Sequence, residues 1–157
     1  MRVRDLMTSE VASVRRTDHL DRAVRHMERR NCGTVPVVDD DERVVGMVTD
    51  RDVCLTALRT DRPLSALAVE EAMSRELFAC GPDDTIDEVE RVMGLHQIRR
   101  MPVVGDGGKL VGILSLDDIA REAYREEDLF APPVSEQAVG RTLGQISRPH
   151  LIQGGGF

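Results

Sequence analysis

Aromatic residues are scarce in this chain of 157 residues, which has no tryptophan, one tyrosine and three phenylalanines. The core must therefore be built from Val, Leu, Ile, Met and Ala. Cysteine is also rare, and Cys32, Cys54 and Cys80 form no Cys-x-x-Cys pair and share no ligand spacing with the four histidines. No metal site is predicted, and the three cysteines are expected to be small buried residues in a reducing compartment.

Long apolar runs are missing as well, and none approaches the ~18 residues of a membrane span. Residues 1–5 lack the apolar core of a signal peptide, so the expected location is cytoplasmic. The net charge of −7 argues against a general surface for nucleic acid or anionic membrane, because such binding needs clustered Lys and Arg. Neither is an expected partner. Arg29-Arg30 and Arg99-Arg100 are each expected to end a helix, where cations are favourable.

Recognisable catalytic chemistry is absent too. The sequence has no Ser-His-Asp order, no paired carboxylates in a defined frame and no metal-ligand set. We therefore predict no catalytic residue and no enzyme activity.

What the sequence does contain is a repeat. An offset of 66 aligns residues 3–58 with 69–124 without a gap, and the apolar positions match nearly everywhere. Each half predicts the order strand, helix, strand, strand, helix. In the first half we expect a strand at Val11–Val14, a helix starting at Thr17-Asp18 and ended by Asn31 to Gly33, a hairpin of Val35–Val38 with Val44–Val48, and a helix at 50–58. In the second half Leu77 to Cys80 repeats the first strand, and Asp106-Gly107-Gly108 is the hairpin turn.

The repeat predicts the domain organisation. A unit of ~60 residues is marginal alone, so two are expected to pack as one pseudo-twofold module of mixed α/β class. The predicted boundaries are 1–60 for the first repeat, 61–68 for a linker, 69–125 for the second repeat and 126–157 for a C-terminal tail. Residues 134–146 of the tail could form a short helix, and Gln153 to Phe157 is expected to be loose.

The most informative motif is Gly46-Met47-Val48-Thr49-Asp50-Arg51-Asp52, which recurs as Gly112 to Asp118. Both copies read Gly, two apolar residues, a hydroxyl residue, two variable residues and Asp, at a predicted junction of strand and helix. One interpretation is a capping box, in which the hydroxyl residue and the Asp satisfy the first turn of the helix. The other is a pair of ligand contacts at a helix start. The sequence alone leaves both open.

The duplicated order of elements, Arg100-Met101-Pro102-Val103-Val104 and the two motif copies together resemble the cystathionine-beta-synthase (CBS) domain. Two in tandem resemble a Bateman module, and the whole chain is similar to stand-alone two-CBS proteins of bacteria. The resemblance covers residues 3–124 and does not reach the tail.

The resemblance implies a fold of two β-α-β-β-α repeats and clefts between them that bind adenosine-containing ligands. It implies that Asp52 and Asp118 contact ribose, that Thr49 and Ser115 contact ribose or phosphate, and that each cleft combines residues of both repeats. The base would lie against the first strands and the residues before Pro36 and Pro102. These implied positions include Ser13, Thr34, Val35, Ala79 and Met101.

The same resemblance implies unequal clefts. Arg99 and Arg100 would meet phosphate beside Thr49 and Asp52, whereas Asp117 would add negative charge beside Ser115 and Asp118. We therefore expect an AMP-, ADP- or ATP-type ligand, with no required cofactor.

Two functions follow as hypotheses. The first is a regulatory sensor of adenosine nucleotides. The second is a ligand-free homodimeric scaffold or protein-interaction adaptor, linked to stress, with an unknown protein partner. A homodimer is expected in either case, through apolar residues on the outer helices and with a further contribution from the tail. The helix residues are Val53, Leu55, Leu58, Ile119 and Tyr124, and the tail residues are Val134, Val139, Leu143 and Ile146.

Overall fold

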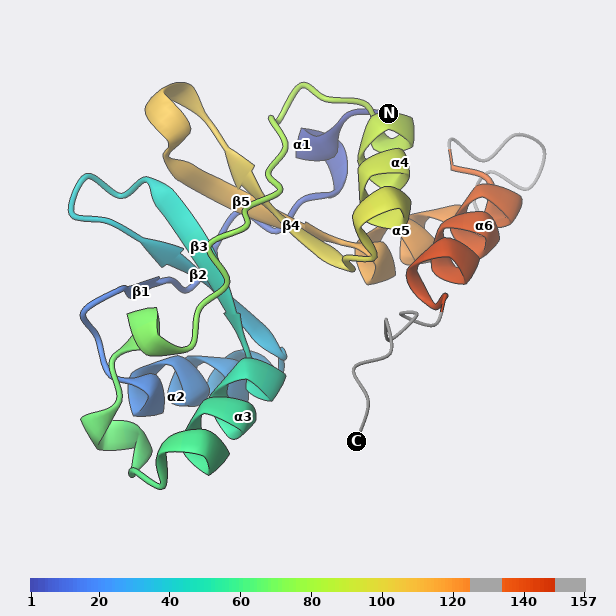
Figure 1. Ribbon diagram of the computed structural model, residues 1–157. Helices are drawn as coiled ribbons and strands as arrows, with labels where there is room; N and C mark the ends of the chain where they lie inside the picture. Colours follow the sequence, from blue (N-terminus) through green and yellow to red (C-terminus); the bar gives the residue numbers. More distant parts are fainter. Residues whose placement is uncertain (125–133, 149–157) are drawn as a thin grey trace. The chain divides into compact units, whose positions relative to one another are not determined.

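The computed structural model describes residues 1–124 and 134–148, and Figure 1 shows the path of the chain. Helices and short sheets alternate, as the predicted mixed α/β class requires. The chain divides into two compact units. The larger unit comprises Thr8–Gly81 and Pro102–Ile113, and the smaller unit comprises Met1–Met7, Pro82–Met101 and the chain from Leu114 onward.

The larger unit is built on a three-stranded sheet in the order β1-β2-β3. Strand β1 (Val14–Arg15) is parallel to β2 (Thr34–Val38), which forms the predicted hairpin with β3 (Val44–Thr49). Helix α2 (Leu20–Arg30) joins β1 to β2, and α3 (Asp50–Thr60) follows β3 directly. Every residue of β2 is buried, so this strand is the centre of the local core.

The predicted linker 61–68 packs onto that core. It contains the short helix η1 (Leu64–Ala66), and a second one, η2 (Val69–Glu71), follows. Leu67 and Val69 are fully buried. The Leu67 carbonyl accepts a hydrogen bond from the N–H of Leu20 at 2.9 Å, so the segment is tied to the start of α2.

The smaller unit consists mainly of helices: α1 (Val3–Leu6), α4 (Ile86–His96), α5 (Leu116–Ala123) and α6 (Glu136–Ile146). Helix α6 confirms the helix predicted within residues 134–146, and it packs against α4 and α5 (Figure 1). The end predicted to be loose, Gln153 to Phe157, lies outside the described residues.

The second hairpin pairs β4 (Arg100–Val104) with β5 (Leu110–Ser115). The predicted turn is the short helix η3 (Asp106–Gly108), in which Gly107 and Gly108 have φ of 68° and 78°. Residues with a Cβ rarely adopt such values, which explains the two glycines.

The structure repeats with the sequence. Val14 pairs in parallel with Val37, and 66 positions later Cys80 forms a parallel bridge with Val103. Each first long helix of a repeat ends on a left-handed residue, Asn31 in one and Gln97 in the other. The internal duplication is therefore visible in local backbone geometry.

The predicted first strands are wrong in extent. Strand β1 is only Val14–Arg15, because the chain before it turns, with the N–H of Val11 donating to the Ser9 carbonyl at 3.2 Å. Residues 77–79 form no strand, and only Cys80 bridges to its neighbour. Alternating apolar residues indicated extended chain there, but a strand also needs a partner to complete its ladder.

The predicted start of the first helix is also early. Helix α2 begins at Leu20 with His19 as its N-cap, rather than at Thr17-Asp18. The Asp18 carboxylate instead accepts from the N–H of Arg15 at 2.7 Å and so closes a turn before the helix. Asp competes for such local bonds outside helices.

Several apolar residues predicted for a dimer contact are buried within the chain. Val53 and Ile119 are 4% and 0% exposed. Val134 and Ile146 of the tail are 4% and 7% exposed. These four side chains stabilise their own units and cannot cover a partner. Cys54, expected to be buried, is exposed, whereas Cys80 is buried.

Candidate functional site

Thr49 and Asp52 form a capping box at the start of α3. The Thr49 hydroxyl donates to Oδ2 of Asp52 at 2.6 Å and accepts from the N–H of Asp52 at 3.2 Å. The same carboxylate oxygen accepts from the N–H of Thr49 at 3.1 Å. Gly46 is the first residue of the motif. A Cβ at this position would collide with the carbonyl oxygen of Ser74, which explains why the motif begins with glycine.

Ser115 and Asp118 repeat that geometry at the start of α5. The Ser115 hydroxyl donates to Oδ2 of Asp118 at 2.5 Å, and the N–H of Ser115 donates to the same oxygen at 2.9 Å. The capping interpretation of the motif is thus realised in both copies. Thr85 and Glu88 form a third capping box at the start of α4, outside the motif, so this geometry by itself does not indicate a ligand.

The two motif carboxylates differ in their second oxygen. Oδ1 of Asp118 forms an ion pair with Arg121, three residues along α5. Oδ1 of Asp52 receives no hydrogen bond or ion pair from any residue that the structure describes. Asp52 is half-buried, and a carboxylate oxygen without a partner can still accept a hydrogen bond. In the sequence, the only signal for this pair is that Arg121 follows Asp118 by three residues in a predicted helix.

The residues predicted to face the base belong largely to the core. Val35 and Met101 are each 1% exposed. Thr34 is buried and its hydroxyl donates to the Val48 carbonyl at 3.1 Å. The side chains of these three residues therefore offer almost no surface to a ligand. Next to Thr34, the Gly33 carbonyl accepts from the N–H of Asp50 at 3.0 Å, which joins the start of β2 to the start of α3.

Arg99 and Arg100 lie in the smaller unit, close to the start of α5. The Arg99 carbonyl accepts from the N–H of Leu116 at 2.9 Å, and the Arg100 guanidinium is 3.7 Å from a carboxylate oxygen of Asp117. The prediction that this pair ends a helix is wrong, because α4 ends at His96 and Arg100 begins β4. The prediction for Arg29-Arg30 is confirmed, since both lie in the last turn of α2.

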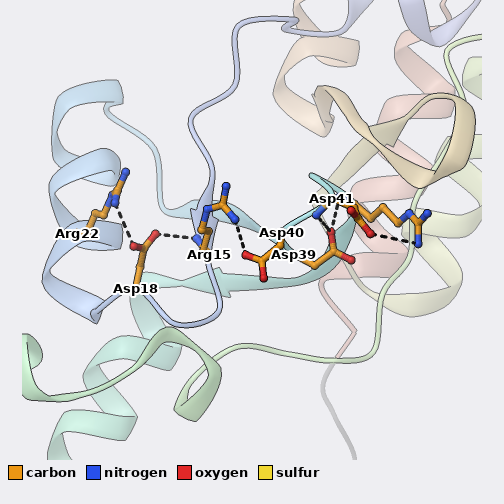
Figure 2. Close-up of polar contacts among 7 residues, drawn as sticks. Arg15, Asp18, Arg22, Asp39, Asp40 and Asp41 are labelled. Carbon is orange, nitrogen blue, oxygen red and sulfur yellow. Dashed lines mark hydrogen bonds and ion pairs between the residues drawn. The ribbon is translucent and has the colours of Figure 1, made fainter.

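Ser13 lies on a cavity, whereas Ala79 is simply exposed. The cavity has a volume of about 320 Å³ and lies within the larger unit. Its polar lining includes Ser9, Arg15, Asp18, Arg22 and Glu42 together with Ser13. Figure 2 shows Arg15 and Arg22 on either side of Asp18, whose carboxylate binds both residues. No sequence motif marked this cavity, because its lining comes from four separate stretches of chain.

Two features are absent from the described residues, a metal-binding cluster and a membrane-spanning helix. Across the described residues, no group of three or more His, Cys, Asp or Glu side chains is placed to hold a metal ion. Within the same residues, no helix is long and apolar enough to cross a membrane.

Comparison with protein-family models finds the same domain in both halves of the chain. The model of the CBS domain matches this chain twice, over residues 3–58 and 69–125. The two matches begin 66 residues apart, which is the offset of the repeat in the sequence.

Full-length relatives and solved structures agree with that match. The chain is 34% identical over 149 residues to the CBS domain-containing protein YhcV of Bacillus subtilis, covering 95% of this chain and 97% of that protein. It is 33% identical over 118 residues to hypoxic response protein 1 of Mycobacterium tuberculosis, covering 75% and 82%. A crystal structure of hypoxic response protein I with two coordinated zinc ions has a TM-score of 0.71 at 32% identity, covering 77% of this chain and 98% of that one.

A second solved structure carries ligands. The CBS domain pair of protein MJ0100 in complex with 5′-methylthioadenosine and S-adenosyl-L-methionine has a TM-score of 0.69 at 26% identity. The likeness covers 77% of this chain and 94% of that chain. At least one relative of this fold therefore binds adenosine-containing molecules.

Proposed function

Because the chain belongs to the CBS domain family, we propose that it is a regulatory module that senses an adenosine-containing ligand and performs no chemistry of its own. The observation that carries the proposal is Asp52. Its carboxylate is held in place by the capping box through one oxygen, while the other oxygen has no partner among the described residues. A positioned carboxylate of this kind can accept hydrogen bonds from ribose hydroxyls.

The start of helix α3 also favours a ligand that carries an anionic group. The first N–H groups of a helix and its dipole favour an anion, so a phosphate or carboxylate on the ligand is stabilised there. Thr49 can exchange its bond to Asp52 for one to the ligand. We assign Ser115 and Asp118 to the corresponding roles at the start of α5. Arg99 and Arg100 are assigned to a phosphate group of the ligand, which would replace Asp117 as the partner of Arg100.

The second function, a ligand-free scaffold, rests on a different observation. Both motif carboxylates already serve as helix caps, and Asp118 has partners on both oxygens. In the smaller unit, both carboxylate oxygens of the motif therefore have partners within the chain, and no ligand is needed to explain them.

A thermal-shift panel decides between the two functions. The full chain is heated with AMP, ADP, ATP, NAD, S-adenosylmethionine and 5′-methylthioadenosine, with GMP and GTP as matched controls for charge. A ligand present at 100 times its Kd adds about 2.7 kcal/mol of stability. We expect at least one adenosine compound to raise the unfolding midpoint and the guanosine compounds to leave it unchanged. No shift with any compound at millimolar concentration would favour the scaffold.

A further inference from the structure

Helix α2 carries a row of basic side chains on one face. They occur at spacings of three, four, seven and eight residues from the first, and such positions lie on the same side of a helix. The four arginines are exposed and the histidine is half-buried. We call this row the basic face of α2; its members are Arg22, Arg25, His26, Arg29 and Arg30.

The acidic residues in and just before the helix do not neutralise the positive charge of the whole row. Arg22 is 3.0 Å from Asp18, and Arg25 is 3.7 Å from Asp21. Arg29 and Arg30 have no ion-pair partner among the residues that the structure describes. The helix dipole favours two cations in the last turn. It does not account for a row that continues over about one further turn in a chain of net charge −7.

The positive charge of the row affects the pKa of His26, which lies in the middle of the row. Burial lowers the pKa of His26 first, and the charges of Arg22, Arg29 and Arg30 lower it further, against an opposing effect of Asp18. The positive potentials of the arginines therefore overlap at the centre of the face.

We propose that the basic face of α2 is a docking surface for a short acidic segment of a partner protein. Guanidinium groups bind carboxylates through paired hydrogen bonds. The row spans eight steps of about 1.5 Å each, or roughly 12 Å, which matches about four residues of extended peptide.

Other polyanions fit less well. The face has no Phe, Tyr or Trp side chain on which nucleic-acid bases could stack. It also has no exposed apolar residue to insert into a membrane, and the net negative charge opposes approach to an extended anionic surface.

The acidic residues 39–41 between β2 and β3 already have partners within this chain, so they are not a free counter-charge for the basic face of α2. As Figure 2 shows, Asp40 pairs with Arg15 at 2.5 Å, and the Asp39 carboxylate accepts from the N–H groups of Asp41 and Arg43, both at 2.9 Å. The proposal is independent of the proposed nucleotide function, because no member of the basic face belongs to the repeated motif.

A labelled peptide of eight glutamates tests the proposal by fluorescence anisotropy with the full chain. We expect the double variant Arg29→Glu/Arg30→Glu to bind at least about tenfold more weakly, since each charge-assisted bond contributes roughly that factor or more. Arg59→Glu/Arg75→Glu changes the net charge equally at exposed positions outside α2 and should bind within about threefold of the wild type. Equal losses in both variants would overturn the proposal.

His26 provides a readout that general electrostatic attraction would not move. Carboxylates docked on the face should raise the pKa of His26 in NMR titrations. Arg29→Gln/Arg30→Gln keeps the helix intact, as circular dichroism can verify, and should also weaken binding. An unchanged His26, or tighter binding of a thymidine oligonucleotide or of phosphatidylserine vesicles than of the peptide, would refute an acidic-peptide site.

Discussion

At the scale of single residues, Asp52 and Asp118 have the same cap but different partners for the second oxygen. Removing the carboxylate of Asp52 takes away an acceptor that is free for a ligand, whereas Asp118 is held by Arg121. We expect Asp52→Ala to weaken binding of the adenosine compound found in the panel by about tenfold or more, and Asp118→Ala to matter less. Calorimetry on the two variants measures this.

Both substitutions also remove a helix cap, at a cost of about 1 kcal/mol. Thr85→Ala is the matched control, because it removes an equivalent capping box outside the motif. It should lower stability without changing affinity. Equal losses of affinity from Asp52→Ala and Asp118→Ala would contradict the asymmetry.

Glu90 is a second residue with a measurable signature. It is 5% exposed on α4, and burial raises the pKa of its carboxyl even though the Thr142 hydroxyl donates to it at 3.2 Å. As pH rises past 4.5, its ordinary value, the unfolded chain loses the proton before the folded chain does, so the free energy of unfolding falls. Above the raised pKa the penalty is complete and constant.

Glu90→Gln should therefore raise the unfolding midpoint at pH 7 and have little effect below about pH 4.5, because glutamine stays neutral and can still accept from Thr142. Denaturant titrations at several pH values measure the difference. Glu136→Gln, at an exposed position on α6, serves as control and should not stabilise the protein. A lower stability of Glu90→Gln at pH 7 would show that the charge itself is needed.

At the scale of elements, α6 is part of the smaller unit because it covers α4 and α5. Ile146, 7% exposed, should cost about 2–4 kcal/mol when changed to alanine, since the cavity adds to the lost burial. Leu143 on the same helix is 46% exposed, and Leu143→Ala should stay within about 0.5 kcal/mol. Similar losses in the two variants would mean that α6 packs differently.

Removal of the whole element tests the predicted boundary between module and tail. A chain ending after Glu126 keeps both family matches, so we expect it to unfold cooperatively. Its midpoint should be clearly lower, because the apolar side chains that α6 covers become exposed. Thermal unfolding followed by circular dichroism measures both properties. Complete loss of folding would place the boundary beyond α6.

At the scale of the whole molecule, the expected homodimer remains a prediction. Leu58 and Tyr124 are the residues of the predicted contact that are well exposed, at 79% and 77%. Light scattering at micromolar concentration should give twice the mass of one chain. Leu58→Glu should weaken association by about tenfold or more, because a charge would be buried at the contact. Leu95→Glu is the control, since Leu95 is similarly exposed but lies outside the predicted contact. A monomer in the wild type would contradict the prediction.

Much of the fold could be predicted because its signals are local. Leu20, Ala23 and Met27 recur at helical spacing in the sequence and are buried in the structure, and both hairpins lie where apolar runs flank a turn. Because the sequence repeats, each of these local patterns occurs twice in the chain. The candidate residues Thr49, Asp52, Ser115 and Asp118 were found in the same way, because a motif at a strand-to-helix junction needs only neighbouring residues to be read.

The failures share one physical cause, which is dependence on distant parts of the chain. Whether Leu77 to Cys80 forms a strand depends on a partner more than twenty residues away, and α6 became part of a core through α4. The cavity beside Ser13 has a lining that no single stretch of sequence contains.

The sequence by itself determined the duplication, the family, the helix caps and the identity of the motif carboxylates, because periodicity and spacing report directly on contacts within a few residues. Only the tertiary structure decided that four apolar side chains proposed for a partner are buried. It also decided that, among the described residues, Asp52 keeps an oxygen without a partner while Asp118 is paired, and which arginines lack a counter-charge. Burial and ion pairing depend on what the remaining chain brings alongside a residue, and this is the part of the physics that spacing along the sequence does not contain.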